Sequence, residues 1–265
     1  MLDYEFMQNA LYAILIITPL FALIGTMVVN NKMAFFSDAL GHSAYTGIAL
    51  GMLFGISNNM VSMILFAIAF AILLNKINES RIVSKDTIIS VFSSTAIAVG
   101  LAILTKNGNY TQISGYLIGD ILNILPHEIL LLLGLAVAVI LFWISSFNKL
   151  LGISVNPMLA KSKGINVKLL ENIFVILIAL IVTISIKWVG ILIINSLLIL
   201  PAASSRNISK NMRQYHFWAI IFSMFSGVLG LIISYYAGIS TGPTIVIVAS
   251  IIYFITFAFR RFSID

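Results

Sequence analysis

Long apolar runs separated by short polar connections make up almost the whole chain. Each run has about twenty residues, which an α-helix needs to cross the hydrocarbon core of a bilayer. The pattern predicts nine such helices, with eight or ten as alternatives because the third and seventh runs are short. The predicted spans are 10–29, 33–56, 60–75, 87–105, 127–146, 169–186, 188–203, 217–236 and 243–259. The sequence therefore predicts an all-α polytopic membrane protein, with residues 1–265 forming a single transmembrane domain.

Basic residues concentrate in every second connection and at the C-terminal end. This set holds thirteen of the 15 Lys and Arg residues, and only Lys106 and Lys187 lie in the other connections. Because Lys and Arg accumulate on the cytoplasmic side, the pattern predicts an external N-terminus and a cytoplasmic C-terminus. An error of one span, above all at the close pair around Lys187, would move the N-terminus to the other side.

Composition agrees with a membrane protein and argues against several functions. Apolar residues make up 60% of the chain and charged residues only 9%, more apolar surface than a soluble core could hide. We expect membrane lipid as a partner and no nucleic acid, because the +6 charge is explained by the cytoplasmic excess. Without cysteine, any metal must be bound by nitrogen and oxygen. The sequence has no P-loop, H-E-x-x-H or G-x-S-x-G motif, so enzyme activity is not expected.

The second predicted span is unusually polar. Asp38 and His42 lie four residues apart and therefore share a helix face, with Thr46 one turn further along as a candidate pathway residue. Ionisable side chains inside a span are costly and usually mark a pathway or a partner. Two interpretations stay open: Asp38 caps the helix and bonds His42, or both contact a divalent Mn, Fe or Zn ion.

Small residues recur every four positions beside this polar row, at Ala39, Ser43, Gly47, Gly51 and Gly55. Such rows let two membrane helices approach closely. Because two ligands make only half of a metal site, we expect this row to bring a second copy of the helix, or another helix, beside the polar pair. Asn195 in the seventh span is a further candidate for the pathway, although a hydrogen bond between helices explains it equally well.

The large cytoplasmic connection at 148–169 contains a short helix with marked ends. Asn156 is a good N-cap, Pro157 suits the first helical position, and Gly164 suits the end of the helix. The segment between them, which includes Ala160, is predicted to be a rigid helix outside the membrane. Such a helix is suited to contact a cytosolic partner.

The external connections carry three further signals. Around Asp120, helical spacing predicts a short interfacial helix. Glu128, after Pro126, is expected to be an ordinary acid in the first turn of a span rather than a cation ligand. Residues 186–188 predict a tight turn, and the glycine-rich segment 235–243 predicts a gate or another tight turn.

Four stretches resemble the permease subunits of ABC importers for zinc, manganese and iron. They are FFSDALGHSAYTGIALG, NPMLAKSKGI, WVGILIINSLLILPAASSR and SYYAGISTGPTIVIV, in the family's order. With the apolar segments between them they cover nearly the whole chain. The Asp and His of the first stretch distinguish this family from importers of vitamin B12 and siderophores. The resemblance implies a type II ABC importer-like permease in a prokaryotic cytoplasmic membrane.

The resemblance also implies partners and residue roles. We expect a homodimer, two cytosolic ATP-binding subunits and an extracytoplasmic metal-binding protein that delivers the ion. Asp38 and His42 are implied as ion contacts, and residues 156–164 as the helix that couples to the ATPase. No permanently bound cofactor is implied, because Mn, Zn or Fe is the cargo.

The chain departs from the family pattern in two places. Asn156 stands where members often have Asp, and Ser240, Thr241 and Gly242 stand where Leu-Pro-Thr-Gly is common. Two rival functions stay open. One is an ion-gradient-driven secondary metal carrier with Asp38 as a proton site, and the other is a siderophore- or cobalamin-type ABC permease.

Overall fold

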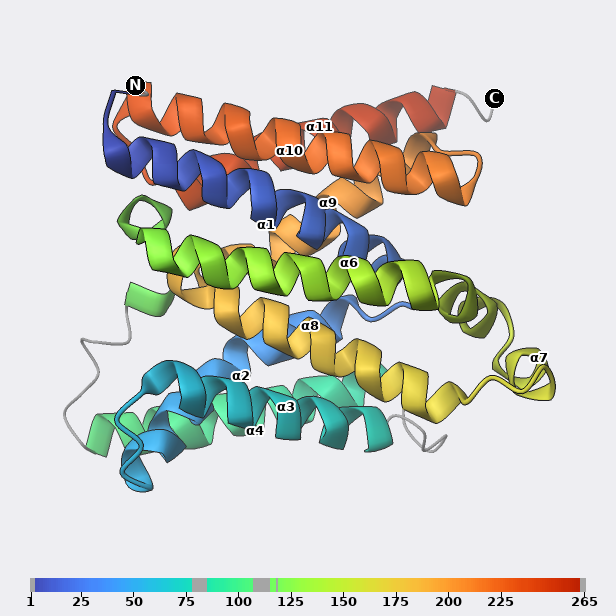
Figure 1. Ribbon diagram of the computed structural model, residues 1–265, viewed down its shortest axis with the longest axis horizontal. Helices are drawn as coiled ribbons and strands as arrows, with labels where there is room; N and C mark the ends of the chain where they lie inside the picture. The colour runs from blue at the N-terminus through green and yellow to red at the C-terminus, as the bar shows by residue number, and fades with distance from the viewer. Residues whose placement is uncertain (1–2, 78–84, 107–114, 118, 263–265) are drawn as a thin grey trace. The chain divides into compact units, whose positions relative to one another are not determined.

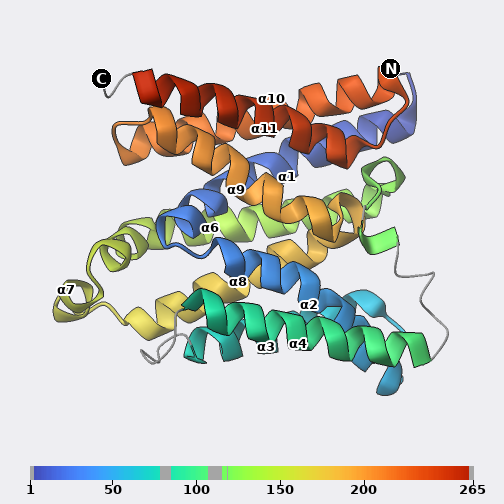
Figure 2. The same cartoon turned by 180° about the vertical axis from the view of Figure 1, so that it is seen from behind.

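The computed structural model describes residues 3–77, 85–106, 115–117 and 119–262. Within these residues the chain forms α-helices and one short 3-10 helix, with no strand (Figures 1 and 2). This confirms the predicted all-α class.

Nine helices in the described ranges have at least 18 residues, and each corresponds in order to one predicted span. They are α1 (Glu5–Asn30), α2 (Ala34–Leu53), α3 (Asn59–Ile77), α4 (Lys85–Lys106), α6 (Pro126–Val155), α8 (Val167–Val189), α9 (Ile191–Ile208), α10 (Met212–Ala237) and α11 (Thr241–Phe262). Seven of them, all except α2 and α9, qualify by length and composition as membrane spans, so nine is an approximate count. The shorter elements are η1 (Ile121–Asn123) and α7 (Pro157–Ser162).

The tight turn predicted at 186–188 lies a little further along the chain. Helix α8 continues through Lys187 and Trp188 to Val189, and α9 starts after Gly190, which has a φ of 88°. Glycine adopts positive φ at little cost, whereas a side chain would be strained there. An apolar count misses this boundary because Trp188 and Val189 are as apolar as the helices on both sides.

The chain divides into two compact units. Unit 1 comprises Met1–Lys32, Ile118–Ile140 and Lys187–Asp265, and unit 2 comprises Met33–Leu117 and Leu141–Ile186. In unit 1, α9 packs against α1, α10 and α11, while α10 also packs against α1 and α11. In unit 2, α2 packs against α3 and α4. The single permease domain expected from the sequence stays a prediction.

Helix α2 lies very close to both of its neighbours in unit 2. A Cβ atom added at Gly47 would lie 2.9 Å from the Cα atom of Met63 in α3. A Cβ atom added at Gly100 of α4 would lie 2.8 Å from the backbone nitrogen of Thr46. Thr46 also donates a hydrogen bond to the carbonyl of Ala96 in α4. Since interiors are close-packed, a larger residue at either glycine requires backbone movement.

Substituting Gly100→Ala is therefore expected to destabilise the protein by about 1–3 kcal/mol through overpacking against α2. Gly134→Ala in α6 is the matched control, because a Cβ atom there meets nothing within 4 Å. Removing a helical glycine at that open position is expected to leave stability unchanged or raise it slightly. Thermal melting of the purified variants in detergent measures both effects. Equal melting temperatures for the two variants would contradict the close contact.

Candidate functional site

Asp38 and His42 lie on one face of α2, one helical turn apart. The His42 Nε2 atom is 3.6 Å from the Asp38 Oδ1 atom, and the two side chains are 29% and 41% exposed, respectively. This separation exceeds a normal N–H···O hydrogen bond. The N-cap of α2 is Met33, so Asp38 lies in the second turn and does not cap the helix. Capping of the helix by Asp38 is thus wrong, whereas pairing of Asp38 with His42 and contact of both with a metal ion stay open as predictions.

The pair offers two ligand side chains and no more from its own surroundings. Among the described residues, no group of three or more His, Asp or Glu side chains lies close enough to hold a metal ion. One carboxylate and one imidazole would leave a bound ion with most of its coordination positions open. The His, Asp and Glu side chains of the described residues therefore supply only these two ligands at this position.

The rest of the polar row is engaged in packing. Thr46 is only 3% exposed, and its hydroxyl group is bonded to α4. Asn195, the other candidate pathway residue, is half-buried in α9 of unit 1. Asp38 and His42 are therefore the residues of the row that keep exposed surface. A pathway role for Thr46 and Asn195 stays a prediction.

Two glycines of the small-residue row, Gly47 and Gly51, face α3 of the same chain. Gly47 contacts Met63, and a Cβ atom at Gly51 would lie 2.1 Å from the Ser62 Oγ atom. Gly55 departs from the predicted row: α2 ends at Leu53, Gly55 has a φ of 72°, and a Cβ atom there would meet nothing within 4 Å. Gly55 therefore belongs to the turn that follows the helix and makes no helix contact.

Helix α7 has the marked ends that the sequence predicted. The Asn156 Oδ1 atom accepts hydrogen bonds from the backbone nitrogens of Met158 and Leu159 at 3.0 and 3.1 Å. Gly164 has a φ of 78°, and Ile165 N bonds the carbonyl oxygen of Ala160 at 3.2 Å. Both ends of this six-residue helix are thus satisfied locally.

Two large apolar side chains of α7 are exposed. Met158 is 82% exposed and Leu159 is 55% exposed, while Ala160 is buried. Exposed apolar residues on a short, bounded helix are typical of a protein–protein contact.

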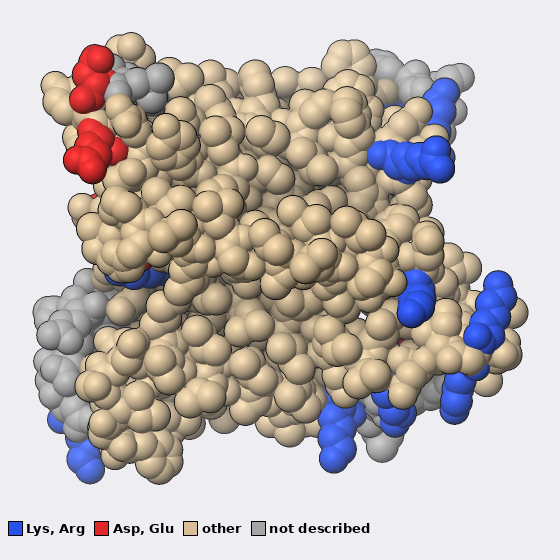
Figure 3. Space-filling view, viewed as in Figure 1, with Lys and Arg blue, Asp and Glu red and all other residues tan. Residues whose placement is uncertain are grey.

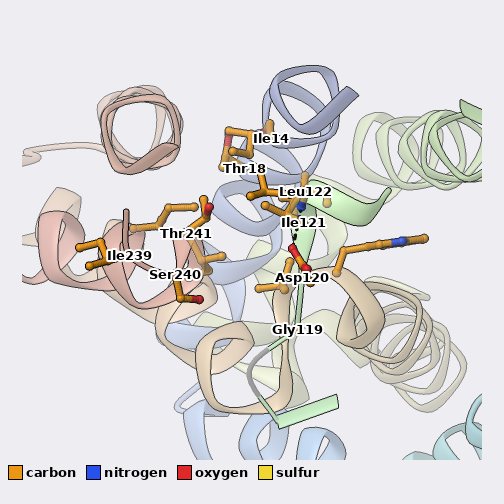
Figure 4. A pocket seen from close by; sticks show the side chains of 15 residues that line it. Ile14, Thr18, Gly119, Asp120, Ile121, Leu122, Ile239, Ser240 and Thr241 are labelled. Atoms are coloured by element: carbon orange, nitrogen blue, oxygen red, sulfur yellow. Dashed lines mark hydrogen bonds between the residues drawn. The ribbon is translucent and has the colours of Figure 1, made fainter. Parts of the chain in front are cut away.

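Three connections predicted to be external meet around one cavity of unit 1. The cavity has a volume of about 280 Å³ and is lined by α1, the segment 119–122, the end of α8 and the start of α11 (Figure 4). Arg206, Lys210 and Arg260, predicted to be cytoplasmic, line a second hollow towards the other end of α11. The connections predicted to be external thus lie together in unit 1, and those predicted to be cytoplasmic lie together elsewhere in it. This grouping supports the alternating membrane sides that the basic residues predict.

Asp120 organises its own loop in this cavity. Its carboxylate accepts a hydrogen bond from Leu122 N at 3.1 Å (Figure 4). It also accepts one from Asn123 Nδ2 at 2.7 Å. Around Asp120, the described residues 115–117 are helical and η1 follows at Ile121–Asn123, whereas Asp120 itself has extended backbone angles. Residues 107–114 and 118 of that connection lie outside the described ranges.

Glu128 joins the start of α6 to the end of α8. Its side chain is buried and accepts hydrogen bonds from Lys187 Nζ, from Trp188 Nε1 at 3.0 Å and from Leu125 N at 3.0 Å. The sequence indicated only an ordinary first-turn acid. The partners on α8 are about sixty residues away in the chain, so no local pattern revealed this connection.

Comparison with known protein families gives a match over nearly the whole chain. The model of the ABC 3 transport family matches residues 3–260. The chain belongs to this family. Membership confirms the resemblance seen in the sequence, and it makes this ABC 3 transport protein a membrane component of a transport system rather than an enzyme.

Several relatives of this ABC 3 transport protein are similar over nearly their full length. The high-affinity zinc uptake system membrane protein ZnuB of Haemophilus influenzae is 34% identical, over 97% of this chain and 98% of the relative. The manganese transport system membrane protein MntC of Listeria monocytogenes is 27% identical, over 98% and 92%. The solved structure of PsaBC from Streptococcus pneumoniae in complex with Fab superposes with a TM-score of 0.83 at 27% identity, over 96% and 91% of the chains.

Replacing Glu128→Ala is expected to destabilise unit 1, because it leaves the Trp188 and Leu125 donors without their acceptor. The Trp188 donor is buried, and leaving it unsatisfied costs about 1–3 kcal/mol of stability. Lys187→Met is expected to cost less, since the Lys187 side chain is 49% exposed and water can replace its partner. Glu5→Gln, at an exposed acid of α1, serves as the control. Thermal melting of the purified variants measures the effect. Equal melting temperatures for Glu128→Ala and Glu5→Gln would contradict a stabilising role of the Glu128 contacts.

Proposed function

We propose that this ABC 3 transport protein is the permease subunit of an ATP-driven importer that carries a divalent transition-metal ion, Mn, Zn or Fe, into a prokaryotic cell across its cytoplasmic membrane. The observation that carries the proposal is the Asp38–His42 pair on α2. A carboxylate and an imidazole together suit these borderline ions. The names of the zinc uptake and manganese transport relatives agree with this cargo.

The separation of the two ligand atoms suits shared coordination. Zn–N and Zn–O bonds of about 2.0–2.2 Å in tetrahedral geometry hold two ligand atoms about 3.4 Å apart. His42 Nε2 and Asp38 Oδ1 lie 3.6 Å apart, so small side-chain adjustments bring both into contact with one ion. Two ligands hold an ion weakly, which favours its release to the next position in the pathway.

A homodimer completes the site in this proposal. A second copy of α2 contributes another Asp38 and His42, so that two carboxylates and two imidazoles surround one ion. The second copy does not approach through Gly47 and Gly51, because α3 of the same chain already covers them. The exposed surface of Asp38 and His42 is the part of α2 that supports such an approach.

The proposed assembly includes two cytosolic ATP-binding subunits and an extracytoplasmic metal-binding protein. The ATP-binding subunits contact α7, whose Met158 and Leu159 present apolar surface on the predicted cytoplasmic side. Asn156 caps α7 without a charge, so this position supplies no ion pair and the apolar side chains carry the proposed contact. The delivery protein docks on the opposite, external side.

Asp38→Ala and His42→Ala are each expected to reduce metal uptake by the assembled importer by at least about tenfold. Loss of a group that only supports a metal ligand already lowers metal affinity or activity by about 10- to 100-fold. His127→Ala and Glu5→Gln replace exposed residues of the same types and are expected to leave uptake unchanged. Uptake of radiolabelled Mn or Zn by cells that express the complete importer measures the effect. Copurification with the ATPase shows that the variants assemble.

Normal uptake in both site variants would refute the site. Uptake that continues without the ATPase and stops with an uncoupler would instead favour the gradient-driven carrier.

Met158→Glu is expected to abolish uptake while leaving the melting temperature unchanged, because Met158 is exposed and its replacement buries no charge within the permease. A charge in an apolar contact weakens binding of the ATPase. Phe54→Glu is the matched control, since Phe54 is 78% exposed and lies on the predicted external side. Copurification of the ATPase with each variant is the direct measurement, and equal recovery would remove α7 from the proposed contact.

A further inference from the structure

A hollow at the predicted cytoplasmic end of unit 1 carries three cations. It has a volume of about 610 Å³ and lies between the end of α9 and the end of α11. Its cations are Arg206, Lys210 and Arg260, and none of the described residues that line it is Asp or Glu. We call these three residues and the space between them the basic hollow.

Hydrogen bonds to neutral groups hold one of these cations in place. Arg260 Nη1 donates to Asn207 Oδ1 at 3.4 Å, and Asn207 Nδ2 donates to Thr256 Oγ1 at 3.3 Å. These contacts tie α9 to α11 and position the guanidinium group, but they do not neutralise its charge. Three like charges in one hollow repel one another, and a bound anion removes that cost.

The positive-inside rule accounts for the presence of these cations but not for their arrangement. The rule requires basic residues on the cytoplasmic side, anywhere in a connection. Packing of α9 against α11 brings the two helix ends together, so that cations from both line one hollow without an acid among its described lining residues. Such a hollow is suited to an anionic ligand.

An apolar row on α11 leads into the basic hollow. Ile247, Ile251, Ile255 and Phe259 follow one another every four residues and therefore share a helix face. Their exposed fractions are 57%, 53%, 50% and 66%. Phe259 also lines the hollow, so the apolar row ends where the cations begin. Figure 3 shows basic side chains gathered at this end of unit 1.

We propose that the basic hollow binds the phosphate headgroup of an anionic phospholipid, with the acyl chains along the row from Ile247 to Phe259. Basic pockets between membrane helices on the cytoplasmic side bind such headgroups. A phosphodiester accepts hydrogen bonds from Arg206, Lys210 and Arg260, and its chains cover apolar surface that a small anion leaves bare. An anionic phospholipid therefore matches both the charge and the apolar row.

Binding of dioleoylphosphatidylglycerol to the full chain purified in detergent tests the proposal. Native mass spectrometry gives the affinity, and the shift in melting temperature gives an independent measure. The triple variant Arg206→Gln, Lys210→Gln, Arg260→Gln is expected to lose about fivefold in affinity per cation, about a hundredfold in total. The control triple Lys149→Gln, Lys161→Gln, Lys163→Gln removes the same charge from exposed residues elsewhere and is expected to change affinity by no more than about twofold.

Two further ligands distinguish a lipid headgroup from a free phosphate anion. Inorganic phosphate and glycerophosphoglycerol, which lack acyl chains, are expected to produce no shift in melting temperature at lipid-saturating concentration. A shift equal to that of the lipid would identify a free-anion site and overturn the proposal. Equal losses in the two triple variants would show general surface attraction and would also overturn it.

If the triple variant fails to fold, the single substitution Lys210→Gln still tests the proposal. Its side chain is exposed, so Lys210→Gln alone is expected to fold normally and to lose about fivefold in affinity. Arg260→Lys keeps the charge and is expected to retain most of the binding. Unchanged affinity in folded Lys210→Gln would refute the site.

Discussion

Close contact between helix backbones keeps the polar helix α2 inside unit 2. A helix that carries an acid and a histidine is costly to expose to lipid, at about 2.5–3.5 kcal/mol for an acid near the bilayer centre. Gly47 and Gly51 on α2 and Gly100 on α4 remove the side chains that would hold its neighbours away. Ala39, Ser43 and Thr46 are buried as a result, while Asp38 and His42 keep part of their surface exposed. The same packing that shelters the helix therefore selects which of its polar groups can meet a ligand.

In the proposed importer, one chain carries both the ion site and the contact with the ATPase. Both proposed elements lie in unit 2. The Asp38–His42 pair lies on a helix fixed by its neighbours, whereas α7 is a short helix whose ends are satisfied by its own residues. Because α7 needs no other element to close its ends, it can present Met158 and Leu159 as a rigid surface.

The features that the sequence predicted are those encoded by neighbouring residues. Apolar runs of membrane-spanning length located all nine long helices of the described ranges, and the Asn156, Pro157 and Gly164 signals located α7. The spacing of Asp38 and His42 placed them on one face. The basic hollow and the bonds of Glu128 could not be predicted, since they join segments far apart in the chain. Gly55 and Gly190 show that backbone conformation, rather than hydropathy, decides where a helix stops.

The bonds of Glu128 also change the electrostatics of the predicted external side. Lys187 is one of only two basic residues assigned to that side, and its charge is balanced by the Glu128 carboxylate. At this end of unit 1, Glu5 and Asp120 are exposed acids among the described residues, and acidic side chains are visible beside the N-terminus in Figure 3. An approaching divalent cation therefore meets an attractive potential at this end of the unit, and increasing the ionic strength would slow its capture by screening that attraction.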